Sequence, residues 1–304
     1  MAELTNVFTT HTAIGNKEDL SDFITNISPE EAPAYDRLGS VNASAVLHEW
    51  QVDVLRAATS NAQTEGKQFS ATAITPTVRI NNRVQTFTEE FTVSTIQEKV
   101  SKAGRAKESA YQMDKAAKAL KRDFEYTLWN LGADATGADG SAGLGRKMKD
   151  IHAWISGTNN TGCVSTLTAD ASATMTETEF NKSWQMIWAQ GGKPNAVYCA
   201  GNLKRLISGW GTSTSRVWSG EKKITNTVGV YEGDYGILET VLDRYTNAKA
   251  VYLVQEDLFK KATLEPVQWR NLGVLGLGTS FMLYTTWTVE SRNASGSGMF
   301  YSNA

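Results

Sequence analysis

The chain has 304 residues, which is enough for one large domain or two smaller ones with a well-buried core. Its 30 basic and 32 acidic residues leave a formal net charge of -2, and this balance argues against a protein that grips nucleic acid through its phosphates. The two cysteines, Cys163 and Cys199, lack the paired spacing of a disulfide framework or a zinc site.

Residues 1–45 are predicted to form an extended arm. They are polar, with a small apolar group at Leu20, Phe23, Ile24 and Ile27, and they show neither the basic region nor the apolar region of a signal peptide. A segment with so few apolar residues cannot build a core of its own, so we expect it to gain order by docking on another surface. A frayed terminus is the alternative.

Residues 46–98 are predicted to form an extended β-ribbon with a loose polar tip. The stretches "VLHEWQVDVLRA" and "TVRINNRVQTFTEEFTVSTI" both alternate between apolar and polar residues. The apolar parity changes between Val84 and Phe87, which indicates a bulge or a twist there. A two-stranded ribbon is marginally stable in water, and no later segment is obviously its sheet partner. We therefore expect the ribbon to lean on another molecule.

Seven side chains in the arm and the ribbon are candidate contacts between subunits. Charged strand residues can pair across a contact, and large aromatic residues are frequent interface anchors. An ordinary exposed charge is the alternative at each charged position. The candidates are Arg79, Arg83, Glu89, Glu90, Phe23, Ile24 and Trp50.

The stretch 104–132 contains the longest helical pattern in the chain. Its apolar stripe, at spacings of three and four, consists of Met113, Ala117, Leu120, Phe124, Leu128 and Leu131. Polar residues such as Lys121 and Glu125 fall mostly off this stripe, and Asp114 precedes Lys118 by the four residues that favour an ion pair. Taken alone, the stretch is typical of an ordinary amphipathic core helix.

The region from residue 135 to 250 is predicted to be α/β. A helix on "TETEFNKSWQMIWAQ" begins with a capping box from Thr176 to Glu179. Its apolar stripe consists of Phe180, Trp184, Ile187 and Trp188. A buried strand around 197–199, a helix from about residue 202, two strands in "VGVYEGDYGILETVLDRY" and a strand at 249–255 follow. Residues 251–304 are β-rich, with strands predicted at 281–290 and 299–302.

No residue set in the chain indicates catalysis or cofactor binding. The three histidines, His11, His48 and His152, lie in no nucleophile motif, and the glycines of "GVLGLG" open no helix. Asp134 and Asp139 lack the spacing of a calcium loop. No apolar stretch is long enough to span a membrane. We therefore expect no catalytic residue, no metal site, no cofactor and no membrane partner.

The order of these parts resembles the major capsid protein, or major head protein, of tailed bacteriophages, which has the Hong Kong 97-type fold. The resemblance is strongest in "HEWQVD", "NNRVQTFTEEFTVS", "AYQMDKAAKALKRDFEYTLW", "VYEGDYGILETVLDRY" and "TTWTVESRNASGSGMF", and it extends over essentially the whole chain. It implies an α+β fold. The implied parts are an N-terminal arm (1–45), an extended β-hairpin loop (46–98), a peripheral domain with a spine helix (99–134), an axial α/β domain (135–250) and closing strands shared by both domains (251–304).

The same resemblance implies a structural protein, and not an enzyme. It would assemble with itself, through hexamers and pentamers, into the icosahedral head of a virion that encloses double-stranded DNA without sequence-specific binding. The ribbon would lie over a neighbouring subunit and the arm would reach another. A portal protein, a separate scaffolding protein and decoration proteins are the implied partners, and assembly would take place in the cytoplasm of the bacterial host.

Three further expectations follow. About 45 residues precede the ribbon, so we expect neither a fused scaffold nor N-terminal cleavage. Lys67 lies near the ribbon tip, but nothing marks a partner for it, so we expect no covalent cross-link between subunits. Two other functions stay open at this point: an encapsulin-like nanocompartment shell, which shares the fold, and a carbohydrate-binding protein that uses the nine Trp and ten Tyr.

Overall fold

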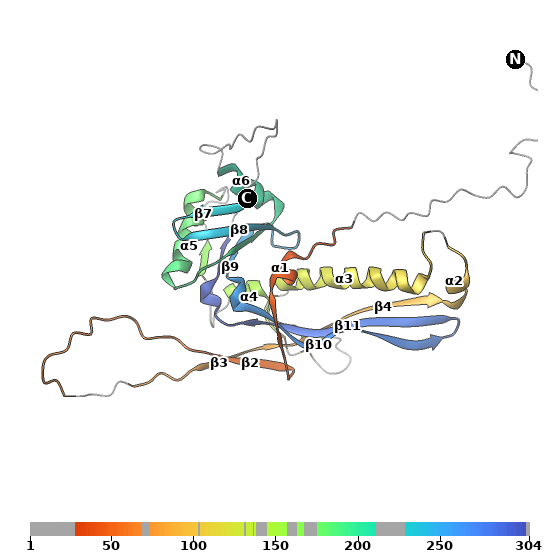
Figure 1. The fold of residues 1–304 in the computed structure, drawn as a ribbon, viewed down its shortest axis with the longest axis horizontal. Coiled ribbons are helices and arrows are strands. Elements are labelled where there is room, and N and C mark those ends of the chain that lie inside the picture. Colours follow the sequence, from red (N-terminus) through yellow and green to blue (C-terminus); the bar gives the residue numbers. More distant parts are fainter. Residues whose placement is uncertain are drawn as a thin grey trace, which may run out of the picture.

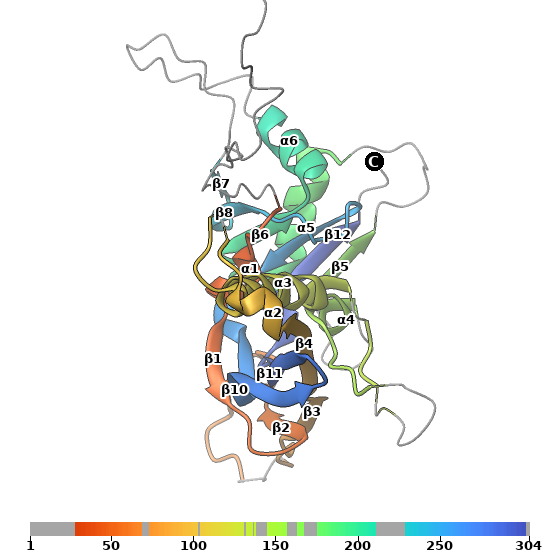
Figure 2. The same cartoon turned by 90° about the vertical axis from the view of Figure 1, so that its right-hand side faces the viewer.

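The computed structural model combines a long helix on a four-stranded sheet, a six-stranded sheet with helices of its own, and a two-stranded ribbon that extends from the body (Figure 1). The structure describes residues 28–68, 73–102, 104–130, 132–135, 137, 145–156, 163–166, 175–210 and 229–301. Figure 2 shows the six-stranded sheet and the four-stranded sheet on opposite sides of the long helix.

The four-stranded sheet pairs segments that lie far apart in the sequence. Its strands, in spatial order, are β1 (Gly39–Asn42), β10 (Phe259–Leu275), β11 (Gly278–Ser291) and β4 (Gln85–Ser94). Strand β1 is parallel to β10, and the other neighbours are antiparallel. Of the glycines at 273–278, Gly276 lies in the turn between β10 and β11 with a φ of 62°, whereas Gly273 and Gly278 lie in the two strands. The expectation that they open no helix is confirmed.

The ribbon is shorter than the sequence predicts. Strands β2 (Leu47–Val52) and β3 (Val78–Arg83) pair antiparallel and form a sheet of their own. After the buried Val84 the chain enters the four-stranded sheet as β4, whose partner is β11. The change of apolar parity therefore marks a passage from one sheet to another. The expectation that no later segment pairs with residues 46–98 is wrong for β4, which pairs with β11. The sequence did not indicate this pairing, because β11 lies about 190 residues further along the chain.

The long helix α3 runs from Glu108 to Asn130, about 35 Å, and covers the four-stranded sheet. At its start, the Glu98 carboxylate accepts hydrogen bonds from the Ser109 N–H at 3.1 Å and the Ser109 hydroxyl at 2.8 Å. Leu120, Phe124 and Leu128 are buried as predicted. Two predictions are wrong: Ala116 takes the inward position expected for Ala117, and Glu125 is buried. Leu131 lies outside the described residues.

The six-stranded sheet has the order β5 (Cys163–Thr166), β12 (Gly298–Tyr301), β9 (Ala250–Val254), β6 (Ala196–Cys199), β8 (Gly236–Leu242), β7 (Val230–Gly233). Its central strands are buried on both faces. In β9, Val251 and Leu253 pack with helices α5 (Glu177–Ala189) and α6 (Gly201–Trp210), whereas Tyr252 packs against Trp129 of α3. This alternation explains why the central strands are apolar at nearly every position.

One core joins the two sheets through the long helix. Phe124 packs on Phe87 of β4 at a ring distance of 5.0 Å, and Trp129, one and a half turns further on, packs on Tyr252 of β9 at 4.6 Å. Short elements connect these layers. They are α1 (Pro33–Arg37), α2 (Thr95–Lys99), α4 (Ile151–Ser156) and the 3-10 turns η2 (Glu256–Leu258) and η3 (Ala294–Gly296).

The local predictions for the α/β part are largely confirmed. Thr176 is the N-cap of α5, and its side chain accepts a hydrogen bond from the Glu179 N–H. Trp188 is the exception, since it is exposed and does not belong to the buried stripe. The prediction missed the 17-residue strand β10 as such. The pairing of β10 with β11 shifts register around Pro266 and before Gly273, and these residues interrupt the alternation that a strand usually shows.

Candidate subunit interfaces

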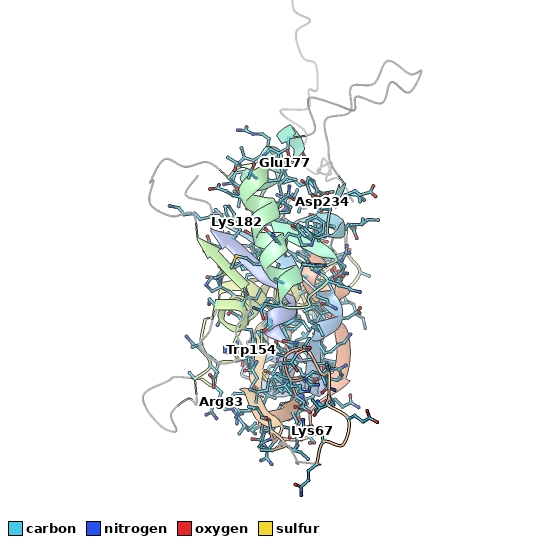
Figure 3. All side chains as sticks on the ribbon, turned by 90° about the vertical axis from the view of Figure 1, so that its left-hand side faces the viewer. Lys67, Arg83, Trp154, Glu177, Lys182 and Asp234 are labelled. Atoms are coloured by element: carbon cyan, nitrogen blue, oxygen red, sulfur yellow. The ribbon has the colours of Figure 1, made fainter. Side chains whose placement is uncertain are left out.

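The outer half of the ribbon presents apolar side chains to solvent. Leu55 is 94% exposed and Ile74 is 93% exposed, and Val54 is exposed as well. They lie beyond strands β2 and β3, on the two segments that extend furthest from the body (Figure 1). Single exposed apolar residues are common, but several on one outstretched segment indicate contact with another molecule. Lys67 lies on the same loop (Figure 3).

The base of the ribbon is fixed to its own chain. Trp50 donates a hydrogen bond from Nε1 to the Ser291 carbonyl at 2.8 Å, and its ring lies 5.6 Å from that of Trp154. The buried amide of Asn82 donates to the Val289 carbonyl at 2.7 Å. Trp50, a candidate subunit contact, thus holds the ribbon to the four-stranded sheet of its own molecule. The ribbon therefore leaves the body in a defined direction.

An ionic contact reinforces this base. His48 Nε2 lies 3.0 Å from Glu290 Oε2, and Arg292 Nε donates to Glu290 Oε1 at 2.9 Å. Burial alone raises the pKa of Glu290, but the hydrogen bonds from His48 and Arg292 outweigh burial and bring the pKa below its ordinary value. Glu290 is therefore ionised at neutral pH.

The two candidate arginines occupy different surroundings. Arg79 forms an exposed ion pair with Glu49 on the paired strand, at 3.4 Å. Arg83 is half-buried, and its Nε donates to Asp134 Oδ2 at 3.1 Å. Arg83 pairs with Leu47 at the base of the ribbon. Arg79 is thus the better placed of the two to meet a neighbouring molecule.

Glu89 and Glu90 lie on β4, at the edge of the four-stranded sheet and not on the ribbon. Glu90 is exposed, whereas Glu89 is half-buried, so the two neighbours point to opposite faces of the strand. The arm candidates Phe23 and Ile24 lie outside the described residues, as do Asp139 and His11. The structure therefore does not bring the five candidates that it describes together into one cluster.

A second apolar surface, which we call the sheet-end surface, covers the outer end of the four-stranded sheet. Trp269 is 62% exposed there, and its neighbours on β10, on the turn after it and on α2 are exposed too. The Thr95 N–H donates to the Leu277 carbonyl at 2.8 Å, which ties α2 to that turn. The sheet-end surface consists of Ile96, Val100, Val267, Trp269, Leu272, Val274 and Leu277.

A third apolar group lies on the edge of the six-stranded sheet formed by β7 and β8. It consists of the exposed residues Val230 and Ile237, whereas the exposed Leu242 lies at the far end of β8, where it pairs with Cys199 of β6. The three surfaces were not recognised in the sequence analysis. The run "PVQWRNLGVLGLG" at 266–278 offered a signal, because its apolar residues follow no helical or strand period that would bury them together.

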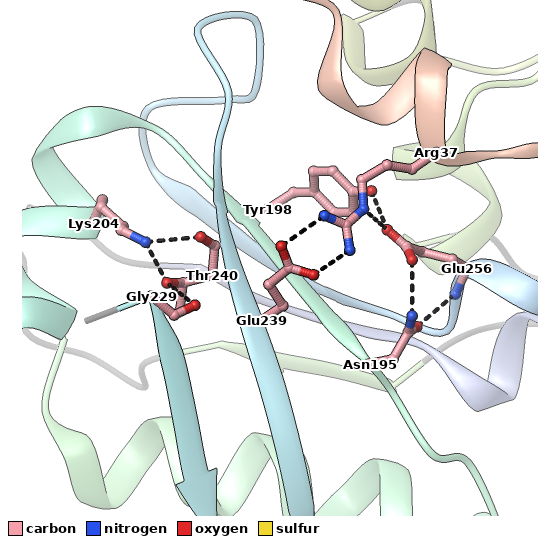
Figure 4. A network of polar contacts seen from close by, with 8 residues as sticks. All are labelled: Arg37, Asn195, Tyr198, Lys204, Gly229, Glu239, Thr240 and Glu256. Atoms are coloured by element: carbon pink, nitrogen blue, oxygen red, sulfur yellow. Dashed lines mark hydrogen bonds and ion pairs between the residues drawn. The ribbon is translucent and has the colours of Figure 1, made fainter. Parts of the chain in front are cut away.

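Helix α1 connects the start of the described chain to both sheets (Figure 4). The Arg37 guanidinium donates to both carboxylate oxygens of Glu239 on β8, and Arg37 Nε donates to Glu256 Oε1 at 2.6 Å. Asn195 and Tyr198 donate to the same Glu256 carboxylate, at 2.8 and 2.5 Å. The hydrogen bonds from Arg37 lower the pKa of Glu239. This network fixes α1 at the joint between β9 and β10, where the chain passes from one sheet to the other.

Among the described residues, no three or more His, Cys, Asp or Glu side chains gather in a way that could hold a metal ion. None of the helices in the described part combines the length and the hydropathy that a membrane span requires.

Comparison with known proteins decides the family. The model of the SU10 major capsid protein family matches residues 4–303. The chain belongs to the SU10 major capsid protein family. It is 28% identical, over 123 residues, to the major capsid protein of Escherichia phage Phieco32, and the matched stretch spans 40% of this chain and 35% of that protein.

Two solved structures show how widely the fold is shared. The capsid of the native GTA particle is 11% identical with a TM-score of 0.70, and the match covers 97% of this chain and 98% of that one. The structure of the Phage G gp27 major capsid proteins and gp26 decoration proteins is 12% identical with a TM-score of 0.55 over 100% of both chains. The predicted Hong Kong 97-type fold is confirmed.

The family gives this capsid protein a structural role, as a subunit that associates with itself in the shell of a virion. The encapsulin-like shell and the carbohydrate-binding protein are not favoured by these comparisons. The exposed apolar surfaces described above are consistent with this role, because a shell subunit must bury part of its surface against copies of itself.

Proposed function

We propose that copies of the chain join as hexamers and pentamers into the closed icosahedral head of a tailed phage, and that the ribbon is the main connector between neighbours. The observation that carries this proposal is the near-complete exposure of Leu55 and Ile74 on an extension whose base is rigidly held. Burial of one such side chain stabilises a contact by about 1.5–3 kcal/mol. A pair of them on every subunit would supply a substantial part of the association energy.

The sheet-end surface of a neighbouring subunit is the proposed receiver of the ribbon. Both surfaces are apolar, and each would remove the other from water. The segment from Val52 to Gly66 spans up to about 45 Å when fully extended, so the ribbon tip reaches well past the edge of its own molecule. The edge formed by β7 and β8, with Val230 and Ile237, is the proposed contact within a hexamer or pentamer.

The proposed division of the chain follows the predicted parts with two changes. The arm was predicted as residues 1–45, but residues 33–42 form α1 and β1 and pack on the body, so the proposed arm is residues 1–32. The spine-helix region is 99–134, the axial domain is 135–250, and the closing strands are 251–304. The hairpin loop was predicted as 46–98, but its ribbon ends at Arg83, and β4 belongs with the sheet below the spine helix. The arm, through Phe23 and Ile24, is proposed to reach a second neighbour.

Other partners are proposed from the family alone. They are a portal protein, a separate scaffolding protein, decoration proteins and enclosed double-stranded DNA, with assembly in the cytoplasm of the bacterial host. The Phage G structure contains decoration proteins beside its capsid proteins. The near-neutral net charge of this chain supports a shell that encloses DNA without gripping it.

Deletion of the ribbon tip tests the proposal. Residues 57–77 are replaced by a short Gly-Ser linker, and the product is examined by circular dichroism and electron microscopy. We expect a folded body that forms no closed shell, because β2 and β3 are retained and only the outstretched loop is lost. Shells of normal size would contradict the role of the ribbon.

Two point variants distinguish an apolar contact at Ile74 from a general effect of adding a charge to the loop. Ile74→Asp places a charge at the proposed contact, and Ala58→Asp adds the same charge at another exposed position of the same loop. We expect Ile74→Asp to reduce shell yield at least tenfold and Ala58→Asp to change it much less, since only the first removes buried apolar area. Equal yields from both variants would contradict an apolar contact at Ile74.

A further inference from the structure

Two acidic side chains are buried together where α1, the spine helix and the six-stranded sheet meet. Glu125 of α3 is 0% exposed, and Asp243, which directly follows β8, is 1% exposed. Their side chains interact with each other. Two ionised carboxylates buried side by side repel each other in a medium of low dielectric, so this position favours holding a proton.

The remaining contacts leave one carboxylate oxygen of the pair without a donor. Glu125 accepts hydrogen bonds from the Ala34 N–H at 2.9 Å and the Tyr35 N–H at 2.8 Å, one on each carboxylate oxygen. Asp243 Oδ1 accepts from the Tyr245 N–H at 2.8 Å. Asp243 Oδ2 is buried and has no donor among the described groups. A single proton held between Glu125 and Asp243 satisfies Oδ2 and removes one of the two charges.

Other titratable groups face the pair from the surrounding elements, but the Tyr198 hydroxyl and the Cys199 thiol do not change their protonation near neutral pH. From β10, Lys261 donates to the Tyr35 carbonyl at 2.6 Å and interacts electrostatically with Glu125. From β6, the Tyr198 hydroxyl and the Cys199 thiol interact with the pair, and burial raises the pKa of both groups, that of Cys199 to about 12. Neither of them ionises near neutral pH.

We propose that Glu125 and Asp243 share one proton and form a pH-controlled latch, which holds α1 between the spine helix and the six-stranded sheet and loosens when the proton leaves. Glu125 binds the backbone of α1 directly, so repulsion inside the pair acts on the segment that links the arm to the body. The inference concerns a single chain and does not depend on which surfaces join the subunits.

The direction of the pH effect follows from proton linkage. Burial, followed by the hydrogen bond and the negative charge of Asp243, raises the pKa of Glu125 from 4.5 to about 8. When α1 detaches and water enters, the pKa of Glu125 returns toward its ordinary value. Detachment therefore releases a proton at neutral pH, so the latch is tight at low pH, weakens as the pH rises, and stops weakening above about pH 8.

Hydrogen exchange of the full chain, followed by mass spectrometry of peptides that cover residues 33–38, tests the latch. After correction for intrinsic exchange rates, we expect the opening of this segment to increase by up to about tenfold per pH unit between about pH 6 and pH 8. Asp243→Asn should reduce this slope, because it removes the negative charge beside Glu125 and its amide can donate a hydrogen bond to the ionised Glu125. All samples are compared in the same assembly state, checked by light scattering.

The control is Asp234→Asn, which makes the same charge change at an exposed position between β7 and β8 (Figure 3). It should keep the wild-type slope. A flat profile in the wild type, or the same slope in Asp243→Asn as in the wild type, would overturn the proposal.

A measurement on the wild type keeps the test independent of whether Asp243→Asn folds. Infrared spectroscopy of the full chain should show the carbonyl band of a protonated carboxylic acid at about pH 7, and the band should disappear by about pH 9. Carboxyl groups with ordinary pKa values are ionised at both pH values and contribute nothing to this band. Absence of the band at about pH 7 would overturn the proposal.

Discussion

Strand β9 and the ribbon contain similar apolar residues, but those of β9 are buried and those of the ribbon are exposed. Every residue of β9, from Ala250 to Val254, is buried, because helices cover one face of the six-stranded sheet and the end of the spine helix covers the other. Leu55 and Ile74 on the ribbon are almost fully exposed. The first region is completed by its own chain, and the second can be completed only by another molecule.

This contrast separates the stability of a subunit from the stability of the shell. Contacts around β9 contribute to folding whether or not copies are present. Apolar residues of the ribbon contribute little until a neighbour covers them, so their free energy appears only on assembly. The ion pairs of Glu290 at the base of the ribbon form within one subunit, like the contacts around β9. They hold the ribbon in place but do not cover its apolar residues.

The largest expected effect comes from a charge placed in the core that the subunit completes by itself. Leu120→Asp buries an unpaired carboxylate under the spine helix. It should reduce the free energy of unfolding by about 4 kcal/mol or more, which is enough to unfold many domains. Ala117→Asp, on the outward side of the same helix, should cost about 0.7 kcal/mol, the difference in helix propensity. Urea unfolding measures both, and similar costs would contradict the observed orientation of the helix.

Two leucine variants test the contrast between the buried strand β9 and the exposed ribbon. Leu253→Ala leaves a cavity between β9 and the helices above it and should reduce the free energy of unfolding of the subunit by about 3 kcal/mol. Leu55→Ala should change that quantity by no more than about 0.5 kcal/mol and should instead lower the yield of shells. Unfolding of unassembled subunits and particle counts by electron microscopy measure the two effects. Equal destabilisation of the subunit would show that Leu55 is covered by its own chain.

The smallest effect concerns the base of the ribbon and depends on pH. The pKa of Glu290 is lowered in the folded chain, so its contribution is present above the ordinary value of 4.5 and is lost as the pH falls through the folded value. Hydrogen exchange of residues 47–52 should therefore accelerate in acid. Glu290→Gln should show the loosened base already at neutral pH, at a cost of about 1 kcal/mol. A variant with wild-type exchange would show that Trp50 and Asn82 hold the base alone.

The local elements could be predicted because neighbouring residues determine them. The spine helix, the Thr176 cap and the parity change at Val84 all depend on residues within a few positions of each other. Even there, a period of 3.6 residues does not decide between Ala116 and Ala117 as the inward position. Burial of Glu125 was equally hidden, because its partners are backbone groups of Ala34 and Tyr35, about 90 residues away.

The sequence by itself determined that the chain has a long helix, an alternating ribbon, an α/β part and no recognisable catalytic residues, and these features were enough to indicate a capsid protein. Only the tertiary structure decided that β4 joins β11, that Trp50 and Arg83 serve their own molecule, and that Glu125 meets Asp243. The physical reason is that periodicity records which face of an element is apolar, whereas pairing between distant segments depends on how the whole chain packs.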